Sequence, residues 1–255
     1  MEPELYKGAH RTLFEAFLKL VDDSDAQTAA LLDMVSWEDA RSLLSIGGGK
    51  GLVEASLLRN APQAKLWYLD PSSEQCEEFR QYMGQQQMLD RVESVVAKTF
   101  QAYDTRNKFD RILSIFSWYF IGANERSLNK LLDLLTPNGV AGIVLPNAES
   151  IFVDFARSLS PNKQMTLVGE DILSVLDTLE CDVNHYTHTK WLAANDLSDG
   201  EFASGASLAF AAFVAVRPIA TFTPAEKQHI VDLLNAKREA EGVPLKWDLM
   251  VIKRI

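Results

Sequence analysis

Short apolar runs alternate with amphipathic stretches through the middle of the chain, and this alternation limits the possible folds more than any other sequence feature. The runs have the length and composition of buried strands, whereas the stretches between them carry apolar residues at helical spacing. Strands that alternate with helices over short connections build a parallel sheet with helices on both faces. Strands are expected at 42–46, 65–69, 91–97, 110–115 and 140–145, and helices near 52–60, 72–85, 123–136 and 147–159.

The two flanks of this region follow different patterns. Residues 1–40 read as helices and predict an N-terminal helical cap. The stretch Thr136–Gly139, which contains proline and glycine, is expected to end the helix before it and to form a tight turn. Farther along, the patterns predict helices at 170–179, about 202–216 and 224–241, with strands at 182–192 and 245–252.

Together these elements predict an α/β fold of the Rossmann-like kind, with a central, mostly parallel sheet of seven strands. We expect a single domain over residues 1–255. Its parts are the N-terminal cap at 1–40, a cofactor-binding core at 41–160 and a C-terminal part at 161–255 that completes the sheet with inserted helices.

Charge narrows the range of partners. The formal net charge is −10 and the pI is near 4.9, which argues against a nucleic-acid partner because such binding depends on a basic surface. An acidic field favours small cationic substrates, although solubility explains the same charge equally well. We therefore expect a small-molecule substrate, no nucleic-acid partner, and a monomer or homodimer.

The cysteines and the N-terminal segment indicate a reduced, cytoplasmic protein. Cys76 and Cys181 lie far apart without metal-ligand spacing, so no metal site is expected. The segment 1–10 has no basic and apolar leader pattern, and the apolar run 206–216 is too short to span a bilayer. No membrane association is predicted.

A glycine cluster follows the first strand of the core. The segment Ser42–Val53 runs from a buried strand through Gly47, Gly48, Gly49 and Gly51 into a helix. Glycine lets a backbone approach a ligand closely or adopt a positive φ. The dinucleotide fingerprint fails at Leu52, and the phosphate-loop pattern fails after Lys50. A ligand with an adenosine and a short amino-acid tail is favoured over a pyrophosphate, and a plain tight turn is the alternative.

Asp70 ends the next strand, in the segment Trp67–Gln75. A carboxylate at this place accepts hydrogen bonds from both ribose hydroxyls of a nucleoside cofactor. The alternative is a helix cap, which Ser72 or Ser73 would also supply. The glycine cluster and Asp70 follow two successive strands, and their joint occurrence favours a cofactor site over a plain turn and a helix cap.

Aromatic residues follow the fourth strand, where ligands bind in open α/β sheets. Phe116, Trp118 and Tyr119 are predicted to form either a cation–π wall for an amine or sulfonium, or packing against the N-terminal helices. Tyr119 is also a candidate hydrogen-bond donor to the substrate. His10 is a candidate base, with a structural role as its alternative.

At these motifs the sequence resembles class I S-adenosylmethionine-dependent methyltransferases, and among them the histamine N-methyltransferase family. The resemblance lies in Leu44–Gly49 and Asp70–Gln75, with fainter likeness at His10–Leu18, Asp196–Gly200 and the final strand. It implies a class I methyltransferase fold and S-adenosylmethionine as cofactor. The cofactor contacts that it implies are Gly47, Gly48, Gly49, Gly51, Asp70, Pro71, Gln75, Thr99 and Ile115.

The substrate side departs from the family. Phe116 stands where the family has a polar glutamine, and Trp247 and Asp248 stand where it has asparagines. Histamine itself is therefore not expected as the substrate. Asp248 is a candidate ligand for a cationic or hydrogen-bonding substrate, with a surface carboxylate as its alternative. The substrate-binding residues expected overall are Phe14, Asp25, Phe116, Trp118, Tyr119, Trp247 and Asp248, and the catalytic candidates are Tyr119, Asp248 and His10.

These observations predict methyl transfer to a small molecule, with an amine nitrogen as the expected acceptor, by in-line displacement with catalysis mainly by positioning. An oxygen acceptor is the first alternative. A protein or RNA acceptor is another, with the acidic charge against RNA. A cofactor-binding fold repurposed for non-methyl chemistry or protein interaction is the last.

Overall fold

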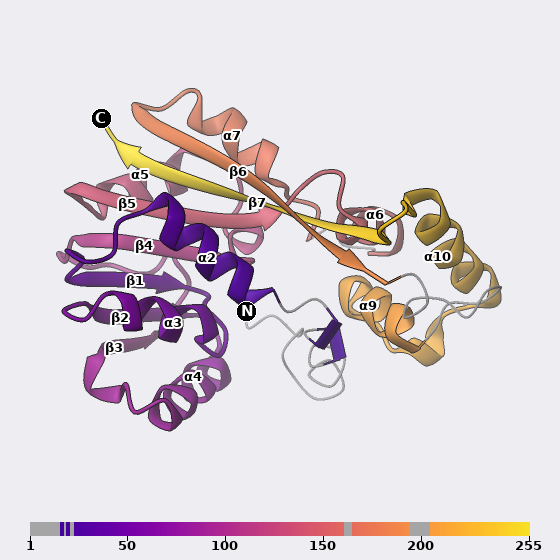
Figure 1. Cartoon of the computed structure of the whole chain (residues 1–255), viewed down its shortest axis with the longest axis horizontal. Helices are drawn as coiled ribbons and strands as arrows, with labels where there is room; N and C mark the ends of the chain where they lie inside the picture. Colours follow the sequence, from indigo (N-terminus) through magenta and orange to yellow (C-terminus); the bar gives the residue numbers. More distant parts are fainter. Residues whose placement is uncertain (1–15, 18, 21–22, 161–164, 194–204) are drawn as a thin grey trace. The chain divides into compact units, whose positions relative to one another are not determined.

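A computed structural model describes residues 16–17, 19–20, 23–160, 165–193 and 205–255. Within these ranges, seven strands form one sheet in the order β3-β2-β1-β4-β5-β7-β6 (Figure 1). The strands are β1 (Ser42–Ile46), β2 (Lys65–Asp70), β3 (Val92–Ala97), β4 (Phe109–Ile115), β5 (Leu135–Pro146), β6 (Cys181–Leu192) and β7 (Val243–Arg254). The predicted α/β fold with a seven-stranded sheet is confirmed.

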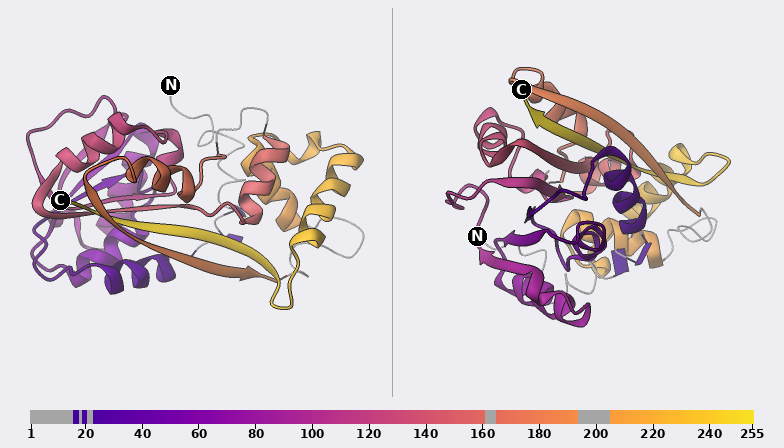
Figure 2. Two further views of the ribbon diagram at one scale, coloured as in Figure 1. Left: turned by 90° about the horizontal axis from the view of Figure 1, so that it is seen from above. Right: turned by 60° about the vertical axis from the view of Figure 1, so that its left-hand side comes forward.

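Helices fill the intervals that the sequence predicts. They are α2 (Ser24–Met34), α3 (Leu52–Asn60), α4 (Ser73–Gln85), α5 (Glu125–Asp133), α6 (Ile151–Leu159), α7 (Gly169–Leu176), α9 (Gly205–Ala215) and α10 (Pro224–Lys237). In the sheet region, α2 packs against α3 and α5 against α7. Figure 2 shows α2 and α5 on opposite faces of the sheet. The sheet is therefore covered on both sides, as its apolar strands require.

The central strands run parallel. β1 pairs in parallel with β2 and with β4, β2 pairs in parallel with β3, and β4 with β5. The arrow of β7 runs against those of β5 and β6 (Figure 1). Because β1, β2 and β4 run parallel, their carboxyl ends meet at one edge of the sheet, which is where ligands bind in open α/β folds.

The start of β5 differs from the prediction. The strand begins at Leu135 rather than at Val140, and the segment 136–139 lies inside it. Its register against β4 shifts there, because Phe109 pairs with Leu135 whereas Arg111 pairs with Val140. The helix before it does stop at Asp133, and the expected turn is present inside the strand, because a Cβ on Gly139 would lie 2.9 Å from the amide nitrogen of Thr136. Leu135 and Val140 both pair with β4, so the residues between them loop out of the ladder.

The chain divides into two compact units. The sheet unit comprises residues 24–145, 169–186 and 248–255, and the helical unit contains the described parts of 1–23, 146–168 and 187–247. In the helical unit α6, α9 and α10 pack together, and the ring of Phe17 stacks on Phe213 at a centroid distance of 4.3 Å. The expected division into cap, core and C-terminal part remains a prediction.

Arg91 ties the end of α3 to the start of β3. Its guanidinium donates hydrogen bonds to the carbonyl oxygens of Leu58 at 2.9 Å and Ala64 at 2.8 Å, and to that of Ala61. The last carbonyls of a helix have no partner within the helix. Arg91 therefore satisfies carbonyls at the end of α3 and in the turn that leads into β2.

Replacing Arg91 with alanine is expected to lower the free energy of unfolding by about 2 kcal/mol, because several carbonyls lose a charged donor. Urea unfolding of the two proteins measures the difference. Arg80→Ala is the matched control. Arg80 donates to one carbonyl, that of Val95, in an exposed hydrogen bond and forms an exposed ion pair with Glu77, so its loss is expected to cost less than about 0.5 kcal/mol. Equal losses in both variants would contradict the role assigned to Arg91.

Candidate cofactor site

Three chain segments meet at the carboxyl edge of the sheet unit. They are the glycine turn after β1, Asp70 at the end of β2, and the segment after β4. The amide of Gly47 donates to the carbonyl oxygen of Leu69 at 2.7 Å, and Ser117 Oγ donates to that of Ile46 at 2.6 Å. These bonds fix the turn between its two neighbouring strands.

The glycines of the turn have different roles. Gly47, Gly49 and Gly51 have φ values of 66°, 55° and 87°, in the left-handed region that favours glycine. A Cβ on Gly47 would lie 2.4 Å from Ser117 Cβ, and a Cβ on Gly51 would lie 2.8 Å from the ring of Phe79. A Cβ on Gly49 would meet no atom of the described residues within 4 Å. Gly47 and Gly51 are thus required by packing, whereas Gly49 borders open space.

Asp70 lies beside the turn and is 7% exposed. Its Oδ1 accepts from the amide of Ser72 at 2.8 Å, and its Oδ2 lies 3.4 Å from the hydroxyl of Tyr68. The same hydroxyl donates to the carbonyl oxygen of Gly49 at 2.9 Å. Desolvation raises the pKa of Asp70 to about 6. Tyr68 therefore links this carboxyl group to the open side of the turn.

Asp70 does not cap the helix that follows it. Ser72 is the N-cap of α4, and its Oγ accepts from the amide of Gln75 at 3.3 Å. Ser72 therefore fills the capping role that was the alternative interpretation of Asp70. The Asp70 carboxyl group remains beside the glycine turn, where the cofactor interpretation places it.

The other predicted cofactor contacts lie near the same edge. Pro71 is half-buried and Gln75 is buried at the start of α4, and Ile115 is half-buried at the end of β4. Thr99 is exposed just after β3, and its Oγ1 accepts from the amide of Ala102 at 3.3 Å. All four follow or end strands of the sheet unit.

The aromatic segment after β4 has a strained backbone. Phe116 has a φ of 48°, although it is not glycine, and its amide donates to the carbonyl oxygen of Val144 at 2.9 Å. Backbone strain of this kind clusters at functional sites. Phe116 and Tyr119 are half-buried. Trp118 is fully buried against Phe100, at 5.4 Å between ring centroids, and its indole N–H has no hydrogen-bond partner among the described residues.

Asp248 is buried in the middle of β7 rather than at a strand end. Its side chain is 0% exposed, and its Oδ1 lies 3.0 Å from Nε2 of His185 on β6. A Cβ on Gly169, the first residue of α7, would lie 2.4 Å from Asp248 Oδ2. The carboxyl group is therefore packed between β6 and the start of α7 within the sheet unit.

Trp247 belongs to a different set of contacts. Its indole N–H donates to Asp23 Oδ2 at 2.8 Å, and the same oxygen lies 3.2 Å from Nε2 of His188. The rings of His188 and Trp247 lie 4.8 Å apart. Consecutive residues of a strand point to opposite faces, so Trp247 and Asp248 cannot line the same wall of a pocket.

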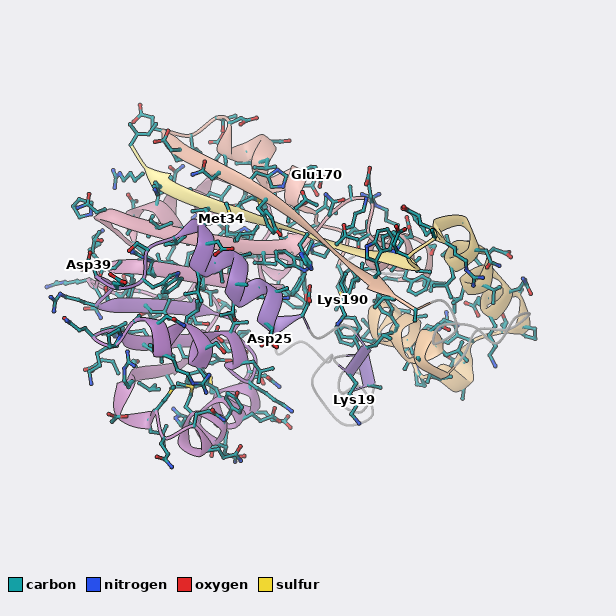
Figure 3. The ribbon with its side chains drawn as sticks, in the orientation of Figure 1. Lys19, Asp25, Met34, Asp39, Glu170 and Lys190 are labelled. Atoms are coloured by element: carbon teal, nitrogen blue, oxygen red, sulfur yellow. The ribbon has the colours of Figure 1, made fainter. Side chains whose placement is uncertain are left out.

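The remaining candidates lie at the N-terminal side. Asp25 is exposed in the first turn of α2 (Figure 3). His10 and Phe14 fall outside the described residues. The roles expected for His10 and Phe14 therefore stay predictions.

Three residues that the sequence reasoning missed shape the site: Tyr68, Ser117 and Glu54. Tyr68 had a signal, because it lies two residues before Asp70 and must share its face of the strand. Ser117 contacts the turn across a long stretch of chain, and nothing in the local pattern indicates that contact. Glu54 lies on α3 with the spacing of an ordinary polar helix residue, yet it is buried.

In the described ranges, no group of three or more histidine, cysteine, aspartate or glutamate side chains is placed to hold a metal ion. In the same ranges, no helix combines the length and apolar character that crossing a bilayer requires.

Part of the core is similar to known proteins. Residues 44–141 match the methyltransferase domain family. A trans-aconitate 2-methyltransferase of Rhodopseudomonas palustris (strain BisA53) is 26% identical over 133 residues, which cover 52% of this chain and 49% of that protein. The chain thus aligns with about half the length of this curated relative.

Solved structures agree on the fold. A methyltransferase from Thiobacillus denitrificans in complex with S-adenosyl-L-homocysteine has a TM-score of 0.61 at 13% identity, over 95% of this chain and 98% of that one. Coclaurine N-methyltransferase has a TM-score of 0.62 at 13% identity, over 91% and 72%. The chain therefore has the class I methyltransferase fold, and residues 44–141 are similar to the methyltransferase domain family.

Proposed function

We propose that the protein transfers a methyl group from S-adenosylmethionine to a small-molecule acceptor, and that the acceptor atom is an amine nitrogen. The observation that carries the proposal is the pairing of the glycine turn with Asp70. The turn is open at Gly49, and Tyr68 joins it to the Asp70 carboxyl group. An open backbone cradle beside a carboxylate suits a nucleoside with an amino-acid tail.

The residues present fit this cofactor. Asp70 would accept hydrogen bonds from the ribose hydroxyls, and the backbone at 47–49 would border the methionine part. Pro71, Gln75, Thr99 and Ile115 would lie along the adenosine. When bound, the cofactor supplies an electrophilic methyl group on a sulfonium. The chain itself has to hold the acceptor in line with that group and exclude water, since a neutral amine needs no base before it attacks.

Phe116 and Tyr119 are the residues best placed to define the acceptor side. Both are half-buried after β4, next to the strands that carry the cofactor residues. An aromatic face attracts a sulfonium or a cationic amine, and the net charge of −10 favours the approach of a cationic amine, which must lose its proton to water before its nitrogen attacks. The resemblance to histamine N-methyltransferases supports an amine, whereas the apolar Phe116 argues for an acceptor other than histamine.

An oxygen acceptor is the second candidate. The curated relative that aligns with 52% of this chain is named for the methylation of trans-aconitate, an acid rather than an amine. A carboxylate acceptor would suit the net charge of −10 less well, because like charges repel.

Label transfer from methyl-labelled S-adenosylmethionine to a panel of amines, phenols and carboxylic acids tests the proposal. We expect labelled products from amines, with the label on nitrogen by mass spectrometry. Glu93→Ala, which changes an exposed carboxyl group on β3, should behave as wild type. If only phenols or acids become labelled, the proposal of a nitrogen acceptor is wrong and the acceptor atom is oxygen. Calorimetry that finds no binding at millimolar cofactor would refute the function altogether.

A further inference from the structure

A carboxyl group lies buried directly behind the glycine turn. Glu54, in the first turn of α3, is 2% exposed. Its Oε1 accepts a hydrogen bond of 2.6 Å from Ser45 Oγ, a donor on β1. No salt bridge to Glu54 is formed within the described part of the chain. A buried carboxyl group without a cationic partner is costly, so its retention calls for a role.

The pair formed by Glu54 and Ser45 touches the turn itself. A Cβ on Gly48 would lie 2.3 Å from Glu54 Oε1 and 2.4 Å from Ser45 Oγ. These two polar atoms therefore pack against the backbone of Gly48, with no space for a side chain between them. Gly49, the next residue, has open space where its Cβ would be. The turn thus has a supported side at Gly48 and an open side at Gly49.

Burial also determines the protonation of this group. Desolvation raises the pKa of Glu54 above its ordinary value and outweighs the hydrogen bonds from Ser45 and from the Glu54 amide, which lower it. Among the residues that the structure describes, no charged side chain contributes to the shift. An uncharged carboxylic acid keeps one acceptor for Ser45 and needs no counter-charge.

We propose that Glu54 is a positioning residue, which as an uncharged carboxylic acid works with Ser45 to hold the glycine turn in the conformation that receives the cofactor. The part of this proposal that concerns the cofactor rests on the proposed function. Glu54 acts through the backbone of Gly48 and does not touch the reacting atoms. Simple space filling behind the turn is the competing explanation, and it would need volume but no hydrogen-bonding group.

Three variants separate these explanations. Glu54→Gln keeps the shape and the acceptor without a proton to lose, Glu54→Leu keeps volume alone, and Ser45→Ala removes the donor. Glu54→Gln should bind S-adenosylmethionine within about twofold of wild type near pH 6, whereas Glu54→Leu should weaken binding by about tenfold or more. Ser45→Ala should weaken it by a smaller factor and so tests the pair even if Glu54→Leu does not fold.

The pH dependence of the melting temperature provides a readout that needs no cofactor. The folded protein keeps a proton on Glu54 that the unfolded chain releases above pH 4.5, so wild-type stability should fall as pH rises from there towards the raised pKa. Glu54→Gln lacks this loss. It should melt increasingly above wild type from pH 5 to pH 8, and the control Glu93→Gln should not.

The outcomes are distinct. If no protein in the set binds S-adenosylmethionine, the proposed function fails, and the melting curves still decide whether Glu54 is buried uncharged. If Glu54→Gln shows the same pH dependence of melting as wild type, or if Glu54→Leu binds the cofactor as tightly as wild type, the positioning role of Glu54 is overturned.

Discussion

Gly47→Ala is expected to lower the free energy of unfolding by about 2–5 kcal/mol. Two costs add. A left-handed backbone costs a residue with a side chain about 1–2 kcal/mol, and Gly47 has a φ of 66°. The new methyl group would also lie 2.4 Å from Ser117 Cβ, which costs about 1–3 kcal/mol in overpacking.

Gly49→Ala is the matched control, because Gly49 has a similar φ of 55° but no neighbour within 4 Å of its Cβ position. Urea unfolding should show a loss of only about 1–2 kcal/mol. Its cofactor affinity should fall instead, by about tenfold or more, because the methyl group enters the open side of the turn. Equal stability losses in the two variants would show that Ser117 gives way, and unchanged affinity in Gly49→Ala would place the cofactor elsewhere.

Asp70→Ala is expected to raise the dissociation constant of S-adenosylmethionine by about 10- to 100-fold, through the loss of charged hydrogen bonds to the ribose. Calorimetry measures this directly. Ser72→Ala is the control, since it removes the N-cap of α4 but no group assigned to the cofactor. It should lower stability by about 1 kcal/mol and leave affinity nearly unchanged. Unchanged affinity in Asp70→Ala would refute the ribose assignment.

The same carboxyl group makes cofactor affinity depend on pH. Its pKa is raised to about 6 by desolvation, so cofactor binding to the wild type should weaken as pH falls through about 6, where the charged acceptor is lost. In the free protein the sign is opposite. Stability declines as pH rises from 3.8 to about 6, because the folded state holds the proton more tightly than the unfolded chain. Asp70→Asn should therefore melt higher than wild type at neutral pH while binding the cofactor more weakly.

The strands were predictable because burial on both faces leaves a plain signal. Ser42–Ile46 is buried at every position but the first and has the predicted bounds, and Lys65–Asp70 extends the prediction by one residue to include the carboxylate. The segment 136–139 was not predictable as part of β5. Proline and glycine there form the turn that their local chemistry predicts, and only the pairing of Leu135 with Phe109 extends the strand to the far side of that turn.

The site was predictable where it depends on local sequence and not where it depends on contacts across the chain. The glycine cluster and Asp70 each follow a strand, so their meeting at one sheet edge follows from parallel pairing. The atoms that require glycine at positions 47 and 48, in contrast, belong to Ser117 and to Glu54 with Ser45. The helical pattern predicts an exposed position for a polar residue such as Glu54, and it cannot show that tertiary packing buries this side chain.

The strand order also has a consequence for biosynthesis. β6 is made before β7, yet β7 lies between β5 and β6 in the sheet. A growing chain that has completed β6 therefore has no place for that strand, and its backbone groups must wait in water until β7 leaves the ribosome. Pairing partners that arrive in this order delay the closing step and lengthen the time during which the unpaired edge of β5 is open to association with other chains.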